Sequence, residues 1–529
     1  MRNKYYILVL LFAPIVLPAQ NQLLPLEHSL NNRVLQSSIR LSRIVHTSVK
    51  PLEVIDVNDG LIRDSVIFRH IEWIPDSSSW ILNKIYNEHL LSYSNESYSV
   101  FADFLPDLQI GYDFNNNRNS LLNSRGFAFG GSVENSFSFY SELFENQAIF
   151  PKYIDSYIRQ NSIIPGQGFL KFYGSKGFDF AYSSASVSYR PTQYLGITAG
   201  HGKHFIGDGY RSMILSDNSF NYPFIKFTAD IWKVKYFVMW TEFLNITSPK
   251  GTESFSTEKK NGVFHYLDAA VSQDFSIGLF EGLIWTVTEN GFEWNYLNPI
   301  IFFRPVDFAI GSPANVVVGV NTSFKLFQNQ LFYGQMLLDE MTIDEFIKNK
   351  GYWGNKYGLQ FGFKSFYCFG YQNLFLQSEI NLASPFTYSH SIPLKNYGHY
   401  NQSLAHPLGA NFYEYVGIAS YYFDRYDLRL QLNYARFGTD SSLVTNYGGD
   451  IYKSYNTRAK DYGNSIGQGI SNTLMYADAK AAYILNPLTN LRFELSLTYR
   501  SLKTESITNN TIWFSFGIRS SFRNLYYDF

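Results

Sequence analysis

The stretch Asp427-Leu428-Arg429-Leu430-Gln431-Leu432-Asn433-Tyr434 decides the fold class, because apolar and polar residues alternate along it. Alternate side chains of a β-strand point to opposite faces, so this strand has one apolar and one polar face. The same two-residue period recurs in residues 491–500 and 225–231. Such strands suit either a soluble sandwich or a membrane barrel, and the alternation alone does not separate the two.

The composition favours the barrel. The 529 residues include 47 Phe, 41 Tyr and 8 Trp, while charged residues make up only 16%, against ~25% in typical soluble domains. A barrel uses aromatic residues on its lipid-facing surface and in its two interfacial girdles. The mean hydropathy of -0.16 fits strands whose polar lumen-facing residues offset their lipid-facing ones.

The amino-terminus predicts export. Arg2 and Lys4 precede an apolar run, residues 5–16, and Leu17-Pro18-Ala19 is a small-residue exit with cleavage expected after Ala19. A transmembrane anchor is the competing interpretation, but the run is short for spanning and lacks a basic flank after it. The net charge of -1 gives no electrostatic case for a nucleic-acid partner.

The carboxy-terminus, Leu525-Tyr526-Tyr527-Asp528-Phe529, is expected to form the last lipid-facing strand and to engage the barrel assembly machinery through Phe529. Its apolar residues are odd-numbered, whereas Ile512, Phe514, Phe516 and Ile518 are even-numbered. A β-bulge near residues 520–524 is expected to reconcile the two sets.

These patterns divide the chain into a signal peptide (1–19), a partly helical periplasmic segment (20–107) and an outer-membrane barrel (108–529). An amphipathic helix is expected after Ser79, beginning at Trp80. A plug inside the lumen is the competing interpretation of residues 20–107. Counting strand-like segments gives about 16 to 20, and 18 is favoured because an even number is expected. Long polar loops are expected at residues 247–262, 339–354, 382–411 and 438–472, with short turns at the other end.

Several motifs also resemble a known family. They are Gly200-His201-Gly202-Lys203-His204-Phe205-Ile206-Gly207-Asp208-Gly209-Tyr210-Arg211-Ser212, Trp353-Gly354-Asn355-Lys356-Tyr357-Gly358 and Ala405-His406-Pro407-Leu408-Gly409-Ala410-Asn411. With them the chain resembles the outer-membrane barrels known as gliding motility protein RemB, over most of its mature length. It is more distantly similar to the capsule assembly protein Wzi, mainly through the last stretch and the general architecture.

The resemblance implies an outer-membrane barrel of about 18 strands with a helical periplasmic portion. Wzi-type proteins are lectins that hold capsular polysaccharide on the cell surface, and RemB-like proteins are associated with surface gliding. The resemblance to Wzi is too loose to carry over individual sugar-binding residues.

Two groups of residues are candidates for a ligand site. The first follows a strand that ends near His201, where a Gly-rich turn is expected to fold tightly, and it comprises His201, Lys203, His204, Asp208, Arg211 and Asp217. Its mixed charges suit either hydrogen bonds to sugar hydroxyls or internal salt bridges. A constriction loop fixed by Arg211 paired with Asp208 or Asp217 is the favoured interpretation.

The second group lies in the loop of residues 382–411 and comprises His399, Asn401, Gln402 and His406. Sugar stacking on the nearby tyrosines is one interpretation, and an ordered structural lid is the favoured one. The spacing of the loop histidines matches no compact metal-ligand motif, so neither a metal nor another cofactor is expected. Charged lumen residues such as Arg429, Arg492 and Glu494 are expected either to form paired networks or to tune a pore.

No nucleophile–base pair stands out, so the protein is predicted not to be an enzyme. The favoured function is a barrel of the outer membrane that supports cell-surface attachment or gliding, or that retains surface polysaccharide. Its expected partners are outer-membrane lipid, the barrel assembly machinery, surface polysaccharide and motility or secretion proteins. The alternatives are a channel for small solutes and an accessory subunit of a secretion or motility complex.

Overall fold

The fold was analysed on a computed structural model of the chain. The structure describes residues 23–42, 44–54, 79–134, 136–247, 256–286, 293–300, 302, 304–309, 311, 314–327, 329–371, 373–442 and 444–529. The expected signal peptide lies outside these residues, as do residues 55–78 of the expected periplasmic segment.

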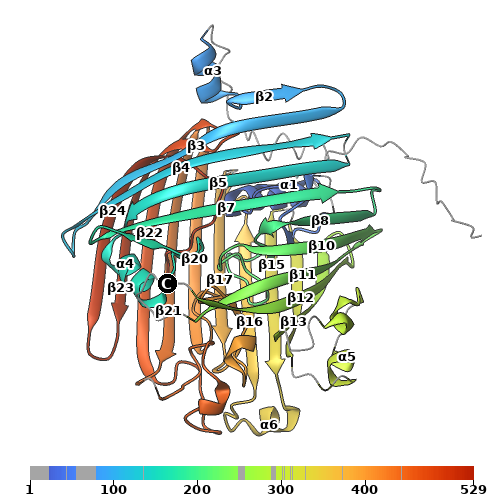
Figure 1. Ribbon diagram of the computed structural model, residues 1–529, viewed down its shortest axis with the longest axis vertical. Coiled ribbons are helices and arrows are strands. Elements are labelled where there is room, and N and C mark those ends of the chain that lie inside the picture. The colour runs from blue at the N-terminus through green and yellow to red at the C-terminus, as the bar shows by residue number, and fades with distance from the viewer. Residues whose placement is uncertain are drawn as a thin grey trace, which may run out of the picture.

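Eighteen antiparallel strands in the described residues form a closed barrel (Figure 1). They are β3 (Tyr98–Asp113), β4 (Arg118–Val133), β5 (Phe137–Ile149), β7 (Gly177–Tyr189), β8 (Leu195–Gly202), β10 (Tyr222–Ile231), β11 (Val234–Ile246), β12 (Thr257–Ala270), β13 (Phe275–Thr286), β14 (Asn315–Leu326), β15 (Gln330–Glu340), β16 (Lys356–Ser365), β17 (Leu374–Ala383), β20 (Phe412–Phe423), β21 (Tyr426–Thr439), β22 (Ile470–Asn486), β23 (Leu491–Lys503) and β24 (Thr508–Ser520). The pairing of β24 with β3 closes the ring. The predicted fold and the favoured strand number are confirmed.

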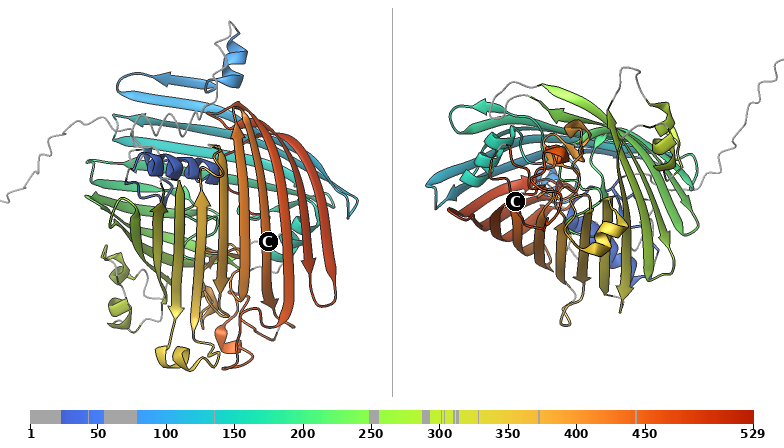
Figure 2. Two further views of the ribbon diagram at one scale, coloured as in Figure 1. Left: turned by 180° about the vertical axis from the view of Figure 1, so that it is seen from behind. Right: turned by 90° about the horizontal axis from the view of Figure 1, so that it is seen from below.

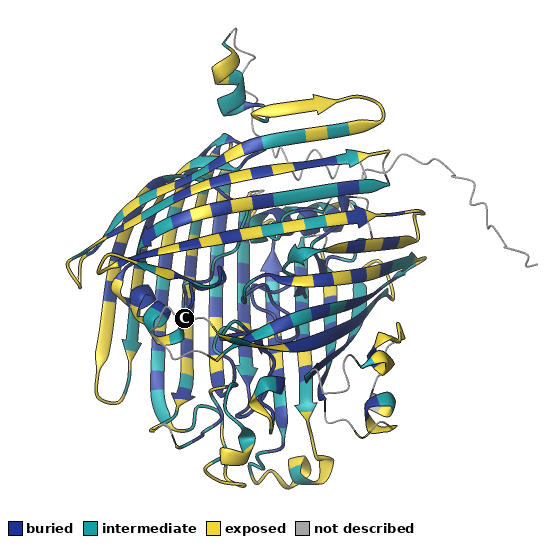
Figure 3. Cartoon of the chain, in the orientation of Figure 1, coloured by how far each residue is buried: buried dark blue, intermediate teal, exposed yellow. Residues whose placement is uncertain are grey.

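Alternation along the strands places polar residues inside the barrel and apolar residues outside. In β21, the side chain of Leu430 is 44% exposed on the outer face, whereas Gln431 is 5% exposed and faces the lumen. The same alternation appears as bands along the strands in Figure 3. The outward position predicted for Ile512, Phe514 and Phe516 of β24 is also confirmed, since all three are exposed.

The two ends of the barrel differ in their connections. At one end, called here the short-turn end, neighbouring strands are joined by tight turns such as those between β20 and β21 and between β22 and β23. At the other, the long-loop end, the connections β15–β16, β17–β20 and β21–β22 are long and carry α6 (Ile343–Lys348), η3 (Pro393–Lys395) and η4 (Tyr455–Thr457). This asymmetry is the one predicted from the sequence.

Several segments fold into the lumen, as the view along the barrel shows (Figure 2, right). The helix α1 (His28–Arg40) packs Leu35 and Ile39 against inward-facing Tyr333 and Val416 of the wall. The strand β1 (Val49–Lys50) pairs with β9 (Phe205–Ile206), and β18 (Gly398–His399) pairs with β19 (Gln402–Ser403). The contacts of α1 are therefore those of a lumen plug.

Of the described remainder of the predicted amino-terminal segment, residues 79–97 lie at the short-turn end. The helix α3 (Trp80–Tyr86) begins where the sequence predicts a helix, and Asn486 of the wall donates a hydrogen bond to the carbonyl oxygen of Lys84 at 3.0 Å. The short strand β2 (Leu91–Ser94) forms an antiparallel hairpin with β3. Because β3 begins at Tyr98, the barrel starts earlier than the boundary expected at residue 108.

The carboxy-terminal prediction is wrong. The last strand ends at Ser520, and residues 521–529 form no strand and no bulge but turn back into the lumen. Tyr526 and Asp528 are buried there, and the carbonyl oxygen of Phe529 accepts a hydrogen bond from Arg500 at 2.9 Å. The physical reason is that the segment binds the inward-folded β8–β10 connection instead of the wall, through Asp528 to the buried Arg211 and Tyr526 to Asp217. In the folded barrel, Phe529 is therefore not part of a strand available to the assembly machinery.

One part of the outer wall is covered by the chain itself. Near β13, η2 (Trp294–Leu297) and α5 (Arg304–Ala309) lie outside the barrel (Figure 1). Tyr296 packs against the outward-facing Val238 and Leu283, and Trp240 donates a hydrogen bond to its carbonyl oxygen at 2.9 Å. None of the helices in the described part of the chain is long and apolar enough to cross a membrane.

The outer face of β21 gives a test of the lipid-facing surface. Leu432→Arg places a charge on that face and should cost about 2–4 kcal/mol of stability in vesicles if the site lies near the bilayer midplane. Val444→Arg is the control, since Val444 is 86% exposed in the β21–β22 connection. Urea titration followed by heat-shifted gel mobility measures both, and equal effects would contradict the assigned outer face.

Candidate functional site

The connection between β8 and β10 carries most of the first candidate group into the lumen. It leaves the wall after Gly202, and β9 within it is held by its pairing with β1. Ser212 donates a hydrogen bond to the carbonyl oxygen of Ile206 at 2.6 Å, which tightens the turn. The predicted inward folding of this connection is therefore present.

Arg211 is the centre of the buried polar network in the lumen. Its guanidinium is 1% exposed and contacts the carboxylates of Glu414 on β20 at 2.8 Å and of Asp528 in the terminal segment at 2.9 Å. Its face lies 4.9 Å from the ring centre of Tyr210 and 5.3 Å from that of Tyr526. Although burial opposes it, the carboxylates of Asp528 and Glu414 raise the pKa of Arg211 well above its usual value.

These contacts correct the pairing expected for Arg211. Asp208 instead accepts a hydrogen bond from Thr47 at 2.8 Å and lies 3.8 Å from Lys50. Asp217 accepts hydrogen bonds from Tyr526 at 2.7 Å and from Asn524 at 2.9 Å. The two acids therefore attach the loop to the amino-terminal plug and to the terminal segment, and Arg211 binds elsewhere.

The second candidate group lies in the β17–β20 connection, in the part of it that folds into the lumen. His406 is fully buried, stacks 4.1 Å from the ring of Phe412 and donates from Nε2 to Glu414 at 2.6 Å. The amide of Leu408 donates to its Nδ1 at 3.2 Å, so the ring is neutral. Burial, despite Glu414, lowers the pKa of His406. His406 and Arg211 thus share one carboxylate.

His399 also has a structural role, because it binds the backbone of β11 at Leu244. Its Nδ1 accepts from the amide of Leu244 at 3.0 Å, and its Nε2 donates to the carbonyl oxygen of Asn221 at 3.1 Å. The amide of Tyr400 donates to the carbonyl oxygen of Leu244 at 2.9 Å. This part of the loop therefore satisfies backbone groups of β11, and burial lowers the pKa of His399 to about 3.

Asn401 and Gln402 also make structural contacts. Asn401 donates to the carbonyl oxygen of Asn161 at 3.1 Å, at the end of α4 (Lys152–Asn161). The side-chain oxygen of Gln402 accepts from the amide of Gly166 at 3.2 Å. Both side chains hold the β18–β19 hairpin against the β5–β7 connection.

The remaining candidates separate from the Arg211 network. His201 pairs with Ala185 and Pro223 at the end of β8, lines a cavity in the lumen, and has its ring 5.7 Å from that of Phe220. His204 is buried, with its ring 4.4 Å from that of Phe224. Lys203 donates to the carbonyl oxygens of Gly166 at 2.8 Å and of Asp217 at 3.1 Å.

Charged residues of the wall are paired in the same way. Glu494 binds Arg492 at 2.8 Å and Arg519 at 2.7 Å, and Arg519 also binds Asp107 at 2.9 Å. These contacts, together with the Arg211 network, form internal salt bridges across segments that fill the lumen. Among the described residues, no group of three His, Cys, Asp or Glu side chains is arranged to hold a metal ion.

A second surface, at the long-loop end, was not predicted. We call it the loop platform and define it as Tyr352, Trp353, Tyr455, Arg458 and Tyr462. Trp353 lies 4.8 Å from Tyr455 and Tyr352 lies 5.4 Å from Tyr462, measured between ring centres. Arg458 covers Trp353 at 4.2 Å. The platform is partly open, and Tyr462 is 50% exposed.

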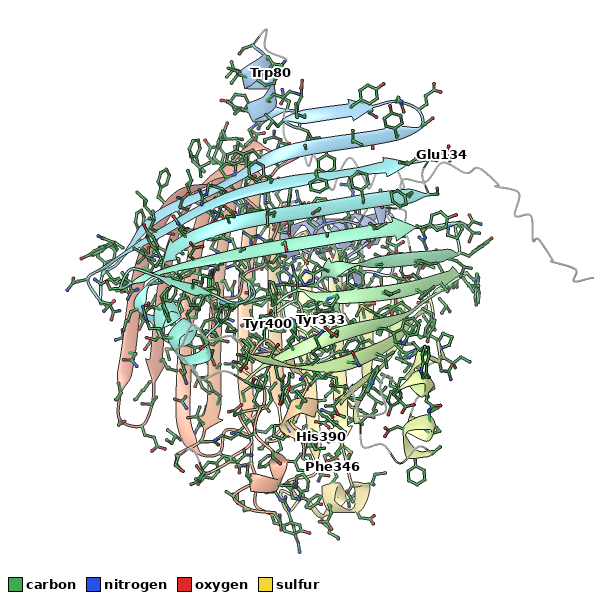
Figure 4. All side chains as sticks on the ribbon, in the orientation of Figure 1. Trp80, Glu134, Tyr333, Phe346, His390 and Tyr400 are labelled. Atoms are coloured by element: carbon green, nitrogen blue, oxygen red, sulfur yellow. The ribbon has the colours of Figure 1, made fainter. Side chains whose placement is uncertain are left out.

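The loop platform is rigid because two connections are joined by their backbones. The amides of Trp353 and Gly463 donate to the carbonyl oxygens of Asp461 and Lys350, at 3.0 and 2.8 Å. His390, 6.0 Å from the ring of Tyr455, borders it. Figure 4 shows His390 toward this end, whereas Tyr333 and Tyr400 lie within the barrel.

The sequence contained part of the signal for this surface. Trp353 opens the motif Trp353-Gly354-Asn355-Lys356-Tyr357-Gly358, and the β21–β22 connection is rich in tyrosine. The contact between Trp353 and Tyr455 joins residues far apart in the chain, so spacing along the sequence could not reveal it.

No protein-family model matches the chain, and no curated protein shows a significant match. Among solved structures, Wzi of Escherichia coli, described as an outer-membrane protein involved in group 1 capsule assembly and as a carbohydrate-binding β-barrel, superposes with a TM-score of 0.55. The two chains are 13% identical, and the match covers 94% of this chain and 99% of Wzi. OprD of Pseudomonas aeruginosa gives a TM-score of 0.44 at 10% identity, covering 82% and 98% of the two chains. The fold is thus that of an outer-membrane β-barrel.

The neutral state of His399 predicts a pH dependence. Its pKa is about 3 in the folded protein and 6.5 when exposed, so its contribution is complete above pH 6.5 and is lost as the pH falls toward 3. At pH 5 the attachment of the β18–β19 hairpin should be weaker by about 2 kcal/mol. Amide hydrogen exchange at Leu244 and Tyr400 measures this attachment.

The control for this measurement is His399→Gln, which keeps a donor and an acceptor but does not titrate. Exchange in this variant should change less between pH 7 and pH 5, after correction for the intrinsic rate. An equal change in both proteins would show that another group controls the hairpin.

Proposed function

We propose that the protein is a non-enzymatic barrel of the outer membrane that holds polysaccharide at the cell surface through the loop platform. The observation that carries the proposal is the combination of a filled lumen with a rigid, partly exposed aromatic surface at one end. Sugar rings present C–H groups that stack on aromatic faces, and Arg458 adds hydrogen-bond donors.

The orientation supports the same function. In outer-membrane barrels, short turns face the periplasm and longer loops face the exterior. The loop platform would then meet extracellular polymer, while α3 and the short turns would face the periplasm. The expected roles in gliding and as a subunit of a motility complex remain compatible, because a cell that holds surface polymer can transmit force through it.

The fold similarity to Wzi agrees with this proposal but does not carry it, since fold and function are separable. Wzi is described as carbohydrate-binding, and the loop platform gives this chain its own chemical basis for the same class of ligand. An amino-terminal signal peptide and insertion by the barrel assembly machinery complete the proposal for its route to the membrane.

The loop platform gives a direct test. Trp353→Ala and Tyr462→Ala each remove a stacking face and should weaken binding of polysaccharide sheared from the organism's own cells by about 1–2 kcal/mol. Binding is measured by biolayer interferometry on protein in nanodiscs, and retention is measured as cell-bound polymer after washing.

Phe346→Ala is the matched control. Phe346 is an aromatic residue of the same end, 49% exposed on α6 and outside the loop platform. Loss of binding in the platform variants with normal binding in this control supports the proposal. Unchanged polymer retention in the double variant Trp353→Ala/Tyr462→Ala would reject it.

The solute channel is separated by conductance. Because internal segments and salt bridges fill the lumen, the intact protein in planar bilayers should show no large, stable openings. Stable openings comparable to those of a general porin would favour transport over surface attachment.

A further inference from the structure

A cavity of about 500 Å³ lies inside the lumen and is separate from the loop platform. It is bounded on one side by the amino-terminal plug and on the other by the inner faces of β3, β4, β5, β7 and β8. Its lining extends from Pro487 in the β22–β23 turn, at the short-turn end, to Lys203 beyond the end of β8. Its size falls in the ~300–1,000 Å³ range of small-molecule sites.

Aromatic side chains line the wall side of this cavity. Phe101, Tyr140, Tyr182 and Phe224 come from four different strands, and their side chains face inward. They offer ring faces and edges at several angles. Such a lining can contact the C–H faces of sugar rings, because its aromatic rings are oriented at several angles.

Two cations of the lining, Lys203 and Arg523, form no salt bridge in the described part of the chain, although Asp217 and Glu142 line the same cavity. Lys203 contacts only carbonyl oxygens, at 2.8 and 3.1 Å. Arg523 donates to the side-chain oxygens of Gln167 and Ser521, each at 3.2 Å, and covers the ring of Phe144 at 3.9 Å. The absence of a direct ion pair at either cation contrasts with Arg211, Arg492 and Arg519, which all bind a carboxylate at 2.8 to 2.9 Å.

The electrostatics around Lys203 agree with this geometry. Burial lowers the pKa of Lys203 to about 8, and Arg523 lowers it further, while the carboxylates of Asp217 and Glu142 act in the opposite direction. The two cations are therefore close enough to repel one another. An anionic group placed between them would remove that repulsion.

The cavity also contains an acceptor for hydroxyl groups. Glu142 accepts hydrogen bonds from Tyr140 at 3.0 Å and from Ser184 at 3.2 Å, so its carboxylate bonds to neutral hydroxyls. A carboxylate has room for about four hydrogen bonds. Glu142 can therefore accept additional donors of the kind that a sugar carries.

We propose that this lumen cavity binds a short segment of an acidic saccharide, with its carboxylate at Lys203 and Arg523 and its rings against Tyr140 and Tyr182. The ligand class rests on the proposed function, because it assumes that the protein handles polysaccharide. The cavity adds a second subsite, which shares no residue with the loop platform, and it selects for negative charge. A saccharide segment would enter this cavity from the short-turn end of the barrel.

The test uses the full mature protein in nanodiscs and the linear trimer of α-1,4-linked galacturonate as the probe, with maltotriose as the uncharged counterpart. Titration calorimetry should show saturable binding of the galacturonate trimer and much weaker binding of maltotriose. Lys203→Gln and Arg523→Gln should each lower the affinity about tenfold, the value of one charge-assisted hydrogen bond. Lys171→Gln, at an exposed position on β6 (Lys171–Tyr173), is the matched control.

Two further variants keep the result interpretable. Arg523→Lys retains the charge and should bind better than Arg523→Gln, and heat-shifted gel mobility confirms that each variant is folded. Trp353→Ala should bind the trimer normally, because the loop platform shares no residue with the cavity.

Absence of saturable trimer binding, or equal binding by wild type and both glutamine variants, would overturn the lumen site. If trimer binding fails while Trp353→Ala still reduces polymer retention on cells, the proposed function stands and only this inference falls. If trimer binding is lost in Trp353→Ala and kept in Lys203→Gln, the probe binds at the loop platform and the lumen site is rejected.

Discussion

The burial of one guanidinium constrains the rest of the structure. Arg211 is 1% exposed, and an unpaired charge at such a site would cost several kcal/mol. Its partners, Glu414 and Asp528, come from the wall and from the end of the chain. Satisfying this single group therefore requires the β8–β10 connection, strand β20 and the terminal segment to meet in the lumen.

The segments that meet at Arg211 also make other contacts within the lumen. The terminal segment that supplies Asp528 also brings Tyr526 to Asp217 and Arg523 to the lumen cavity. The β17–β20 connection brings His406 to the same Glu414 and supplies His399 to the edge of β11. Open strand edges are unstable where lipid surrounds them, so the inward loops both close the lumen and complete the wall.

The proposed function uses two separate surfaces of this barrel. A filled lumen leaves little room for free diffusion, and the loop platform provides a surface for polymer outside. The aromatic and cationic lining of the lumen cavity provides a different surface at the short-turn end. The filled lumen and the exposed aromatic surface are the two features on which the proposal of polysaccharide retention rests.

The barrel could be predicted from the sequence because strand alternation is a local property. Leu430 and Gln431 show their faces through their immediate neighbours, and the same holds for Phe514 in β24. The terminal residues 525–529 alternate in the same way, yet they lie in the lumen. Alternation shows that a strand has an apolar face and a polar face. It does not show whether the apolar face contacts lipid or protein.

The candidate site was less predictable, because its contacts join distant residues. Placing Arg211, His399 and His406 in structural networks was the favoured interpretation, and their contacts have that character. The partners of Arg211 are more than 200 and 300 residues away, at sequence separations of 203 for Glu414 and 317 for Asp528, the difference between 528 and 211. No spacing rule connects such positions, so the expected pairing with nearby Asp208 or Asp217 was wrong.

A double-mutant cycle on Arg211 and Asp528 tests the central claim most directly. Unfolding free energies in vesicles would be compared for the wild type, Arg211→Met, Asp528→Asn and the double variant. The account predicts that Arg211→Met costs about 3–5 kcal/mol and that the two changes couple by at least ~1 kcal/mol. Additivity within ~0.5 kcal/mol would show that the terminal segment does not bind Arg211 and would contradict the account.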